Sequence, residues 1–336
     1  MVSEQNNTRI GLLLGSTTPP EHIARLAREV EDGGFGELWI PEDYFFLGGM
    51  SAAAIALGAT ERIPVGTAVV SAMVRHPALL AMEIATLARA FPGRLRPGIG
   101  HGVPGWTAQM GLTVSSPMSA LRETMVGVRS LLSGEKVTDQ GRVHSFAEVA
   151  LTHPPSERVP LYGGVLGDKG IGLVGELADG LVVSVLATPE YVAATREKLD
   201  KAAASAGRDS RPEMVVLVAL NVTRDAAQAA ATREAIKPIL AFYLAATGPN
   251  PLLASIDGNE RLAEMLTRGG PEVVHAEMPD EWVDAMSITG STEGARTRLR
   301  CFFDAGADRV VVVPLVEAGA EESLATVREL LADFPV

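Results

Sequence analysis

Two short segments of the chain carry side chains that could perform acid–base chemistry. Glu42 and Asp43 are neighbouring carboxylates directly after the apolar segment 37–41, and His101 stands between two glycines after segment 94–100. A carboxyl or imidazole group at such a place can donate or accept a proton. Because successive strand residues point to opposite sides, we expect at most one carboxylate to face a site. The structural alternatives are a solvated turn or helix cap for the carboxylates and simple packing for the histidine.

The segment YGGVLGDKG, residues 162–170, has the composition of an anion-binding loop. Its glycines let backbone N–H groups approach a ligand, and the N-terminus of the helix predicted behind it favours negative charge. The segment lacks the GxGxxG pattern of dinucleotide sites and the Walker pattern, so a glycine-rich turn without a ligand is the alternative. Its candidate binding residues are Gly163, Gly164, Val165, Gly167, Asp168 and Lys169.

The elements that position these residues are predicted by short apolar segments that alternate with helical patterns. Strands that are apolar throughout are typical of parallel sheets, in which both faces are buried. Eight repeats of a strand and a helix favour a closed (β/α)8 TIM barrel, of α/β class, over an open doubly wound sheet, and place the site where the strands end. The predicted strands are 9–15, 37–41, 63–70, 94–100, 159–164, 180–186, 213–220 and 308–315.

The helices between these strands are predicted from apolar residues at helical spacing. Residues 98–150 and 222–307 are longer than a simple helix requires, so we interpret them as insertions that carry function within one barrel domain, 1–336. Thr188 and Pro189 have the residue types of a helix N-cap and first helical position. The predicted helices are 20–33, 52–60, 78–91, 119–133, 168–178, 189–207 and 320–333.

Other patterns of catalytic residues are missing from the sequence. It has no GxSxG segment, and no cluster of histidine, cysteine and carboxylate residues has the spacing of metal ligands. Arg75, His76 and Pro77 precede a helical pattern, and the fixed φ of proline suits the first turn of a helix. We interpret these residues as a structural hinge and expect Arg75 to pair with an acid across the barrel.

The composition indicates which binding partners and which cellular compartment to expect for the protein. The net charge is −12 and the isoelectric point is about 5.1, which argues against binding nucleic acid or an anionic membrane surface. The single cysteine, Cys301, cannot form an internal disulfide, which fits a reducing cytoplasm. No apolar run approaches the ~20 residues needed to span a bilayer, and the polar start MVSEQNNTR does not have the pattern of a signal peptide. We therefore expect a cytoplasmic protein.

The segment 62–102, RIPVGTAVVSAMVRHPALLAMEIATLARAFPGRLRPGIGHG, resembles the luciferase-like monooxygenase superfamily. Members of that superfamily have a bend after the third strand, then Arg-His-Pro, then a helix with the pattern Ala-x-Glu-x-Ala-x-Leu, then a glycine-rich fourth strand. The resemblance continues in the segments ETMVGVRSLLSGEKVTDQGRVHSF, VPLYGGVLGDKGIGLVGELADG and FFDAGADRVVVVP. It covers nearly the whole chain and is weakest over residues 240–288.

This resemblance implies a TIM barrel that binds a flavin or the deazaflavin coenzyme F420 at its C-terminal mouth. In deazaflavin-binding members a non-prolyl cis peptide after strand three backs the ring, and the corresponding bond here is Ala68–Val69. The phosphate-bearing tail would lie against the loop from Gly164 to Lys169. The residues that the resemblance places at the ring are Ala68, Val69, Val70, Ser71 and His101.

Two departures from the family pattern narrow the activity that the resemblance implies. The sugar-phosphate dehydrogenase and luciferase branches carry a histidine after strand two, where this chain has Glu42-Asp43-Tyr44. The dehydrogenase branch also carries a glutamate after strand four, where this chain has His101-Gly102-Val103. We therefore expect an F420-dependent oxidoreductase that reduces a C=C or C=N bond, with Asp43, Glu42 and His101 as candidate catalytic residues. The alternatives are an FMN-dependent monooxygenase and a non-catalytic flavin-binding homologue.

Substrate and oligomeric state are less constrained by the sequence. The segment AMEIATLARAF is apolar over more than one helix face, which is typical of a buried helix and, together with the family resemblance, predicts a homodimer. The substrate itself is not identified. Apolar residues expected at the mouth of the barrel indicate an apolar, bulky small molecule, and they are Tyr44, Phe45, Phe46, Trp106 and Met110.

Overall fold

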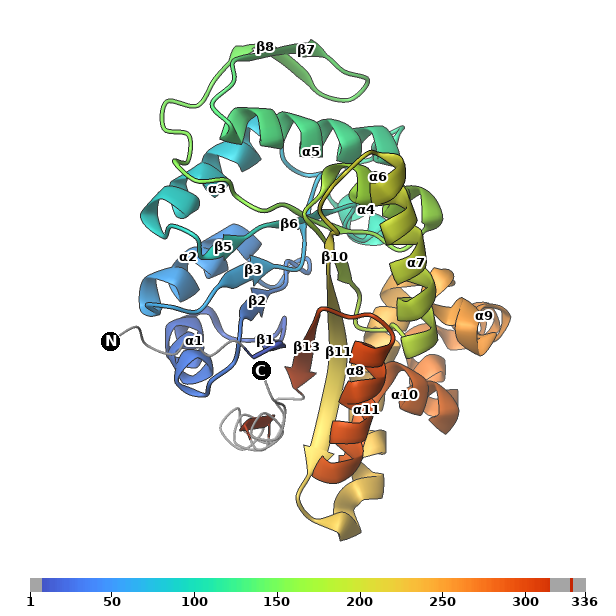
Figure 1. Ribbon diagram of the computed structural model, residues 1–336. Helices are drawn as coiled ribbons and strands as arrows, with labels where there is room; N and C mark the ends of the chain where they lie inside the picture. Colours follow the sequence, from blue (N-terminus) through green and yellow to red (C-terminus); the bar gives the residue numbers. More distant parts are fainter. Residues whose placement is uncertain (1–7, 315–326, 329–336) are drawn as a thin grey trace.

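The computed structural model describes residues 8–314 and 327–328, and its centre is a curled sheet of parallel strands surrounded by helices (Figure 1). The strands are short, and those at the centre are buried along their whole length, as their apolar sequences predict. The barrel strands are β1 (Ile10–Leu13), β2 (Leu38–Ile40), β3 (Val65–Thr67), β4 (Val70–Ser71), β5 (Leu95–Arg96), β6 (Gly98–Gly100), β9 (Tyr162–Gly164), β10 (Gly180–Val183), β11 (Glu213–Thr223) and β13 (Arg309–Pro314).

The pairing of these strands closes the sheet into a ring. β3 and β4 are the two halves of one predicted strand, and β5 and β6 are the two halves of the next. β3 pairs with β5 and β4 pairs with β6, and the path continues through β9, β10, β11 and β13 to β1, β2 and back to β3. These pairings are parallel, so the predicted (β/α)8 TIM barrel is confirmed, and each of the eight predicted strand positions is occupied.

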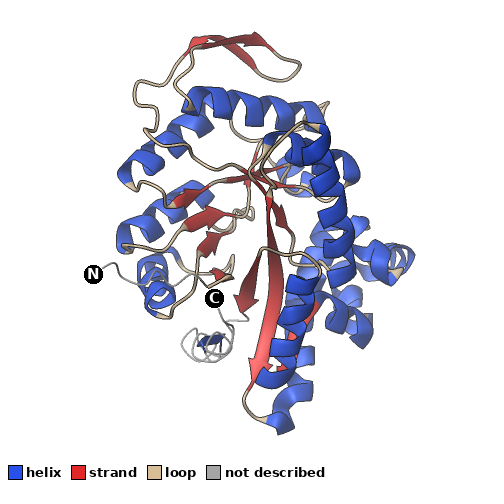
Figure 2. Ribbon diagram, in the orientation of Figure 1, coloured by secondary structure: helices blue, strands red, loops and turns tan. Residues whose placement is uncertain are grey.

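Helices cover the outside of the barrel (Figure 2). The buried residues of the first helix are Ile23, Leu26, Ala27 and Val30, at the spacing that predicted it. The predicted helix 320–333 lies outside the described residues, apart from 327–328. The outer helices are α1 (Ile23–Asp32, after a 3-10 turn at Pro20–His22), α2 (Gly49–Ala59), α3 (Pro77–Ala90), α5 (Pro117–Leu132), α6 (Asp168–Leu177), α7 (Pro189–Ser205) and α11 (Thr292–Asp304).

The first residues of two helices follow from local signals in the sequence. Thr188 caps α7, because its Oγ1 accepts a hydrogen bond from the backbone N–H of Tyr191 at 3.1 Å, and Pro189 is the first helical residue. His76 caps α3 through Nδ1, which accepts from the N–H of Ala78 at 3.1 Å. The Arg-His-Pro segment therefore acts as a helix start, as its proline predicted.

The two long segments outside the barrel pattern hold further elements. Residues 98–150 contain α4 (Pro104–Gln109), α5 and a hairpin of β7 (Val137–Gln140) and β8 (Ser145–Val149). β12 pairs in parallel with the extended C-terminal half of β11. The additional elements of residues 222–307 are α8 (Ala229–Thr247), α9 (Asn259–Glu277), α10 (Asp280–Met286), β12 (Ser287–Ser291) and the 3-10 turns Ala226–Gln228 and Pro251–Ile256.

Charged side chains close the N-terminal end of the barrel. Arg96 of β5 lies 3.0 Å from Glu37 before β2, and Arg309 of β13 lies 2.6 Å from Glu213 of β11. β5 and β11 are not neighbours in the ring, yet Arg96 also lies 3.4 Å from Glu213, so these groups meet inside the barrel. Burial raises the pKa of Glu37, and the two arginines oppose that rise. This charged cluster, Glu37, Arg96, Glu213 and Arg309, fills the end opposite the site.

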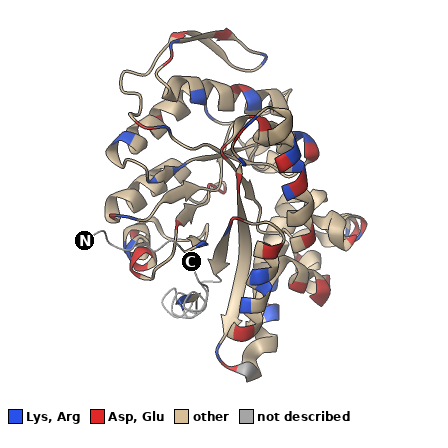
Figure 3. Cartoon of the chain, viewed as in Figure 1, with Lys and Arg blue, Asp and Glu red and all other residues tan. Residues whose placement is uncertain are grey.

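Charge is unevenly distributed over the outer helices (Figure 3). Lysine, arginine and acidic residues are dense on α7, α10 and α11, whereas α2 carries no charged residue. Within residues 8–314 and 327–328, none of the helices combines the length and the apolar composition needed to cross a bilayer. The helix next to α2, α3, carries two charged residues, Glu83 and Arg89.

Candidate active site

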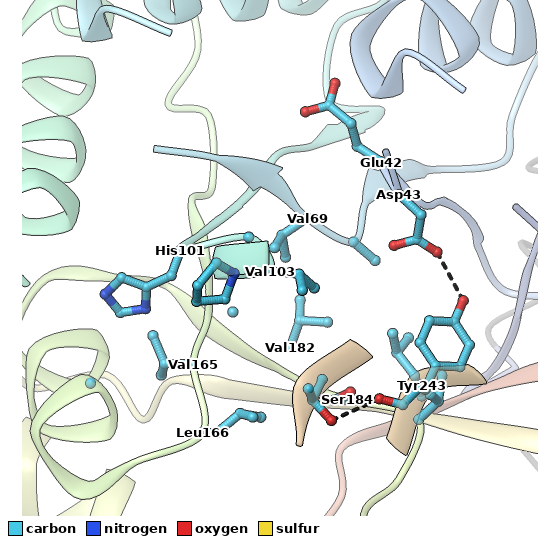
Figure 4. A pocket seen from close by; sticks show the side chains of 18 of the residues that line it. Glu42, Asp43, Val69, His101, Val103, Val165, Leu166, Val182, Ser184 and Tyr243 are labelled. Carbon is cyan, nitrogen blue, oxygen red and sulfur yellow. Dashed lines mark hydrogen bonds between the residues drawn. The ribbon is translucent and has the colours of Figure 1, made fainter. Parts of the chain in front are cut away.

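The C-terminal ends of the barrel strands surround a cavity of about 690 Å³. Its walls come from the loops after β2, β6 and β9 and from α8, which reaches over the mouth from the second insertion. Figure 4 shows Asp43 and Tyr243 on one side of this cavity and His101 on the other, with Val69 and Val182 between them. A ligand site at this end is expected for a parallel barrel.

Most of the predicted site residues lie at this cavity, although they are far apart in the sequence. Three of them do not line it. Val70 is fully buried, Ser71 donates its hydroxyl hydrogen bond to the carbonyl of His101 at 2.8 Å, and Gly163 packs against Val174 of α6. Those that line the cavity are Glu42, Asp43, Ala68, Val69, His101, Gly164, Val165, Gly167, Asp168 and Lys169.

The break between β3 and β4 forms the floor of the cavity. The Ala68–Val69 peptide bond is cis, as predicted, and both residues line the cavity. The Val69 side chain fills the space beside two glycines: a Cβ added at Gly100 or at Gly164 would lie 2.6 Å from a Val69 methyl group. Glycine is thus required at both positions for Val69 to keep its place. A second cis bond, Tyr44–Phe45, was not predicted.

Asp43 is a buried carboxyl with an asymmetric set of partners. Tyr243 donates a hydrogen bond to Oδ2 at 2.9 Å, and the Ser16 hydroxyl donates to the same oxygen. Among the residues that the structure describes, none is bonded to Oδ1, which points away from Tyr243 toward the middle of the cavity (Figure 4). Burial raises the pKa of Asp43, although both donors act in the opposite direction. Burial therefore makes the neutral carboxyl easier to form, and Oδ1 is the oxygen that no described donor occupies.

Glu42 has a different environment from its neighbour. Its two oxygens accept a bidentate pair of hydrogen bonds from Arg75, at 2.6 and 2.7 Å, and Oε1 also accepts from the N–H of Gly49 at 3.0 Å. The Tyr44 hydroxyl donates to Oε2 at 3.2 Å. The expected pairing of Arg75 with an acid is confirmed. Because the Glu42 carboxylate is occupied by these donors, Asp43 is the member of this adjacent pair that presents a free carboxyl oxygen to the cavity.

His101 faces the cavity from the opposite side. Burial lowers its pKa, so the imidazole is favoured in its neutral form. Its Nε2 is buried and has no hydrogen-bond partner among the described residues. A buried nitrogen without a partner is costly, and a ligand that supplies one would remove that cost. His101 is therefore suited to hold a ligand by one hydrogen bond.

The loop between β9 and α6 gives the cavity its anion-binding character. Gly167 is the N-cap of α6, and a Cβ added there would meet no atom within 4 Å, so the loop leaves open space at the helix N-terminus. Lys169, in the first turn, lines the cavity, while Asp168 is paired with Lys198 at 2.6 Å. A helix N-terminus with a nearby lysine favours a phosphate group.

The sequence did not predict two partners of Asp43. Ser16 directly follows the predicted strand 9–15, and Tyr243 comes from α8. Tyr243 is 200 residues from Asp43 in the chain, so no local pattern could connect them. The only signal was the excess length of residues 222–307, which indicated an insertion with a function.

The fold and the cavity define a (β/α)8-barrel protein with a ligand site at the C-terminal mouth. A family model described as luciferase-like monooxygenase matches residues 6–309. The chain belongs to the luciferase-like monooxygenase family.

Curated proteins and solved structures resemble the chain over nearly its whole length. A 5,10-methylenetetrahydromethanopterin reductase of Methanolobus tindarius is 26% identical over 320 residues, 94% of this chain and 96% of that protein. The structure of the coenzyme F420-dependent tetrahydromethanopterin reductase from Methanopyrus kandleri matches with a TM-score of 0.81 and 23% identity, over 95% and 97% of the two chains. An F420-dependent secondary alcohol dehydrogenase in complex with an F420–acetone adduct matches with a TM-score of 0.80, 21% identity and coverage of 96% and 98%.

Proposed function

We propose that this chain is a coenzyme F420-dependent oxidoreductase that reduces a C=N or C=C bond of a small organic molecule. The observation that carries the proposal is the position of Asp43, a buried carboxyl with one free oxygen, beside the floor formed by Ala68 and Val69. The names of the relatives support the cofactor, since a reductase and a dehydrogenase of similar fold are described as F420-dependent.

The residues at the cavity fit a deazaflavin with a phosphate-bearing tail. Ala68 and Val69 line the cavity at its floor, where a planar ring would lie. The unpartnered Nε2 of His101 can bond to a polar atom of that ring or its side chain. The open space at Gly167 and the positive charge of Lys169 suit the phosphate. These residues would therefore hold the cofactor.

The side chains of the site have separate roles in the proposed reaction: proton donation, positioning and exclusion of water. When bound in its reduced form, the deazaflavin would supply a hydride to one atom of the substrate's double bond and would itself become oxidised. Asp43 would donate the proton on Oδ1 to the other atom, and Tyr243 and Ser16 hold Oδ2 so that the carboxyl keeps this orientation. The Arg75–Glu42 pair fixes the backbone next to Asp43. The apolar residues Val69, Val182 and Leu217 exclude water.

Titration of the pure protein with oxidised F420 and, separately, with FMN tests the proposal. We expect F420 to bind at micromolar or lower Kd and FMN to bind much more weakly, with a Lys169→Ala variant losing about 1–3 kcal/mol of F420 binding energy, as a charge-assisted contact does. Lys201→Ala is the matched control, because Lys201 is an exposed residue of α7 that does not line the cavity.

FMN binding at equal or higher affinity would overturn the F420 proposal. In that case oxygen consumption with added flavin reductase would identify an FMN-dependent monooxygenase. A protein that binds both compounds weakly or not at all, yet forms a dimer, would be the non-catalytic homologue.

A further inference from the structure

Aromatic side chains gather at the mouth of the cavity, in a chain that has only nine Phe, four Tyr and three Trp. They come from three separate segments: the loop after β2, the short helix α4, and α8. Successive rings are in contact, with centroids 6.4 Å apart for Tyr44 and Trp106 and 6.1 Å apart for Trp106 and Phe242. The members of this aromatic cluster are Tyr44, Phe45, Phe46, Trp106, Phe242 and Tyr243.

Three rings of the cluster line the cavity, and others pack against them. Tyr44, Trp106 and Tyr243 line the cavity, whereas Phe242 does not and lies nearly parallel to Trp106, at 29°. Phe242 is 37% exposed and Phe46 is 45% exposed, so this cluster is not a closed core. Ring faces left open at a cavity mouth favour a partner that is itself flat.

The charges near the cluster argue against an anionic substrate. Among the described residues that line the cavity, Lys169 is the only lysine or arginine, and it belongs to the loop at the N-terminus of α6. Arg75 is bound by the Glu42 carboxylate. The groups next to the aromatic cluster are hydroxyls and the two acids, so a negatively charged group would find no cation there.

We infer that the substrate carries a flat, uncharged, conjugated ring that stacks on Trp106, next to the Tyr44 ring, which is tilted by 59° from that of Trp106. This inference rests on the proposed function, in which the cofactor ring would lie on the floor at Val69 and the substrate ring would lie between that floor and the aromatic cluster. It specifies a substrate class that the proposed activity alone leaves open. Flexible aliphatic compounds and phosphorylated sugars fall outside this class.

The test measures binding to the protein saturated with oxidised F420, by calorimetry, so that no turnover is required. Three probes are compared: quinoxaline, which is flat, neutral and contains C=N bonds; 2-decalone, which is neutral and bicyclic but not flat; and quinoxaline-2-carboxylate, which is flat and anionic. We expect quinoxaline to bind most tightly, about fivefold to tenfold better than either of the others, which is the scale of one aromatic contact.

Variants of Trp106 test whether the preference for quinoxaline depends on the Trp106 ring. Trp106→Leu keeps an apolar side chain but removes the ring face, and we expect it to raise the Kd for quinoxaline by about fivefold to tenfold. Trp106→Phe keeps a ring and should restore most of the affinity. Leu112→Ala is the control, since Leu112 is exposed just after α4 and does not line the cavity. The F420 affinity should be unchanged in all three variants.

Each outcome of this experiment decides the inference. Equal affinity for 2-decalone, tighter binding of the carboxylate, an unchanged Kd in Trp106→Leu, or no binding of any probe to the F420-loaded protein would overturn it. If the wild-type protein fails to bind F420 but binds quinoxaline in a Trp106-dependent way, the proposed function fails while the aromatic site stands.

Discussion

Glu42 and Asp43 are adjacent carboxylates whose neighbours give them different chemistry. Arg75 occupies both oxygens of Glu42, so this side chain holds the backbone in place. Asp43 receives both of its hydrogen bonds on Oδ2 and leaves Oδ1 facing the cavity. Neither carboxylate could be preferred from the sequence, because the partners that separate them come from residues 16, 75 and 243.

The pH dependence of the proposed reduction should follow the Asp43 carboxyl. Because Asp43 must be protonated to donate, the rate should be highest below its pKa and should fall as the pH rises through that pKa, which burial raises. Tyr243→Phe removes a donor that favours the carboxylate, so it should raise this pKa and move the alkaline limb of the kcat profile to higher pH. Asp43→Asn should lower kcat by about 10²–10⁴-fold and remove the limb. Stopped-flow measurement of F420 oxidation against pH gives these values.

Tyr191→Phe is the control for the pH experiment. Its hydroxyl bonds the carbonyl of Leu166 and has no contact with Asp43, so the limb should stay at its wild-type position. A profile that is the same in wild type and Tyr243→Phe would mean that a group other than Asp43 supplies the proton, with His101 as the next candidate.

At the scale of elements, neighbouring barrel strands build the floor of the site together. β3 and β4 separate at Ala68–Val69, and β6 and β9 provide the glycines against which Val69 packs. The family resemblance located this bend from the sequence. The packing of Val69 against Gly100 and Gly164 could not be derived in the same way, because it depends on which strands become neighbours.

A Gly164→Ala variant should disturb this floor. The added Cβ would lie 2.6 Å from a Val69 methyl group, so Val69 must move, and overpacking of this kind costs about 1–3 kcal/mol of unfolding free energy. We expect a lower Tm and weaker F420 binding, measured by thermal unfolding and by titration.

The double variant Val69→Ala/Gly164→Ala makes room for the new Cβ and should recover most of the lost stability. Gly172→Ala on α6 is the control, because a Cβ there meets no atom within 4 Å. If Gly164→Ala has the wild-type Tm and F420 affinity, the close packing of Val69 is not what shapes the floor.

The strands of the barrel were easier to predict than the elements outside it. The eight barrel strands are short, apolar and buried, so their length and composition together indicate strands of a parallel sheet. The hairpin β7–β8 was missed because its residues are mostly polar and exposed, and β12 was missed because SITGS is short and contains glycine. Both elements depend on tertiary pairing, which a local pattern does not encode.

At the scale of the whole molecule, the surface of α2 and α3 favours the predicted homodimer. Ile55 of α2 and Leu79 and Met82 of α3 are 41%, 55% and 52% exposed, and α2 has no charged residue. Large exposed apolar side chains on adjoining helices are typical of an interface. We expect light scattering to give about twice the chain mass of 35.3 kDa.

A Leu79→Glu/Met82→Glu variant should convert this dimer to a folded monomer, because carboxylates would be buried in the interface without partners. The control is Lys201→Glu on the charged side of the molecule, which should stay dimeric. A wild-type protein that has the mass of one chain at micromolar concentration would contradict the prediction.

The charged cluster Glu37, Arg96, Glu213 and Arg309 has a consequence for the kinetics of the proposed enzyme. Because this cluster fills the barrel end opposite the cavity, cofactor and substrate would enter and leave through the same cavity mouth. In the proposed arrangement the coenzyme lies at the floor and the substrate lies nearer the mouth, so we expect a compulsory order in which coenzyme binds first and leaves last. Excess substrate would then trap the oxidised coenzyme in an abortive ternary complex, which would appear as uncompetitive substrate inhibition against reduced F420.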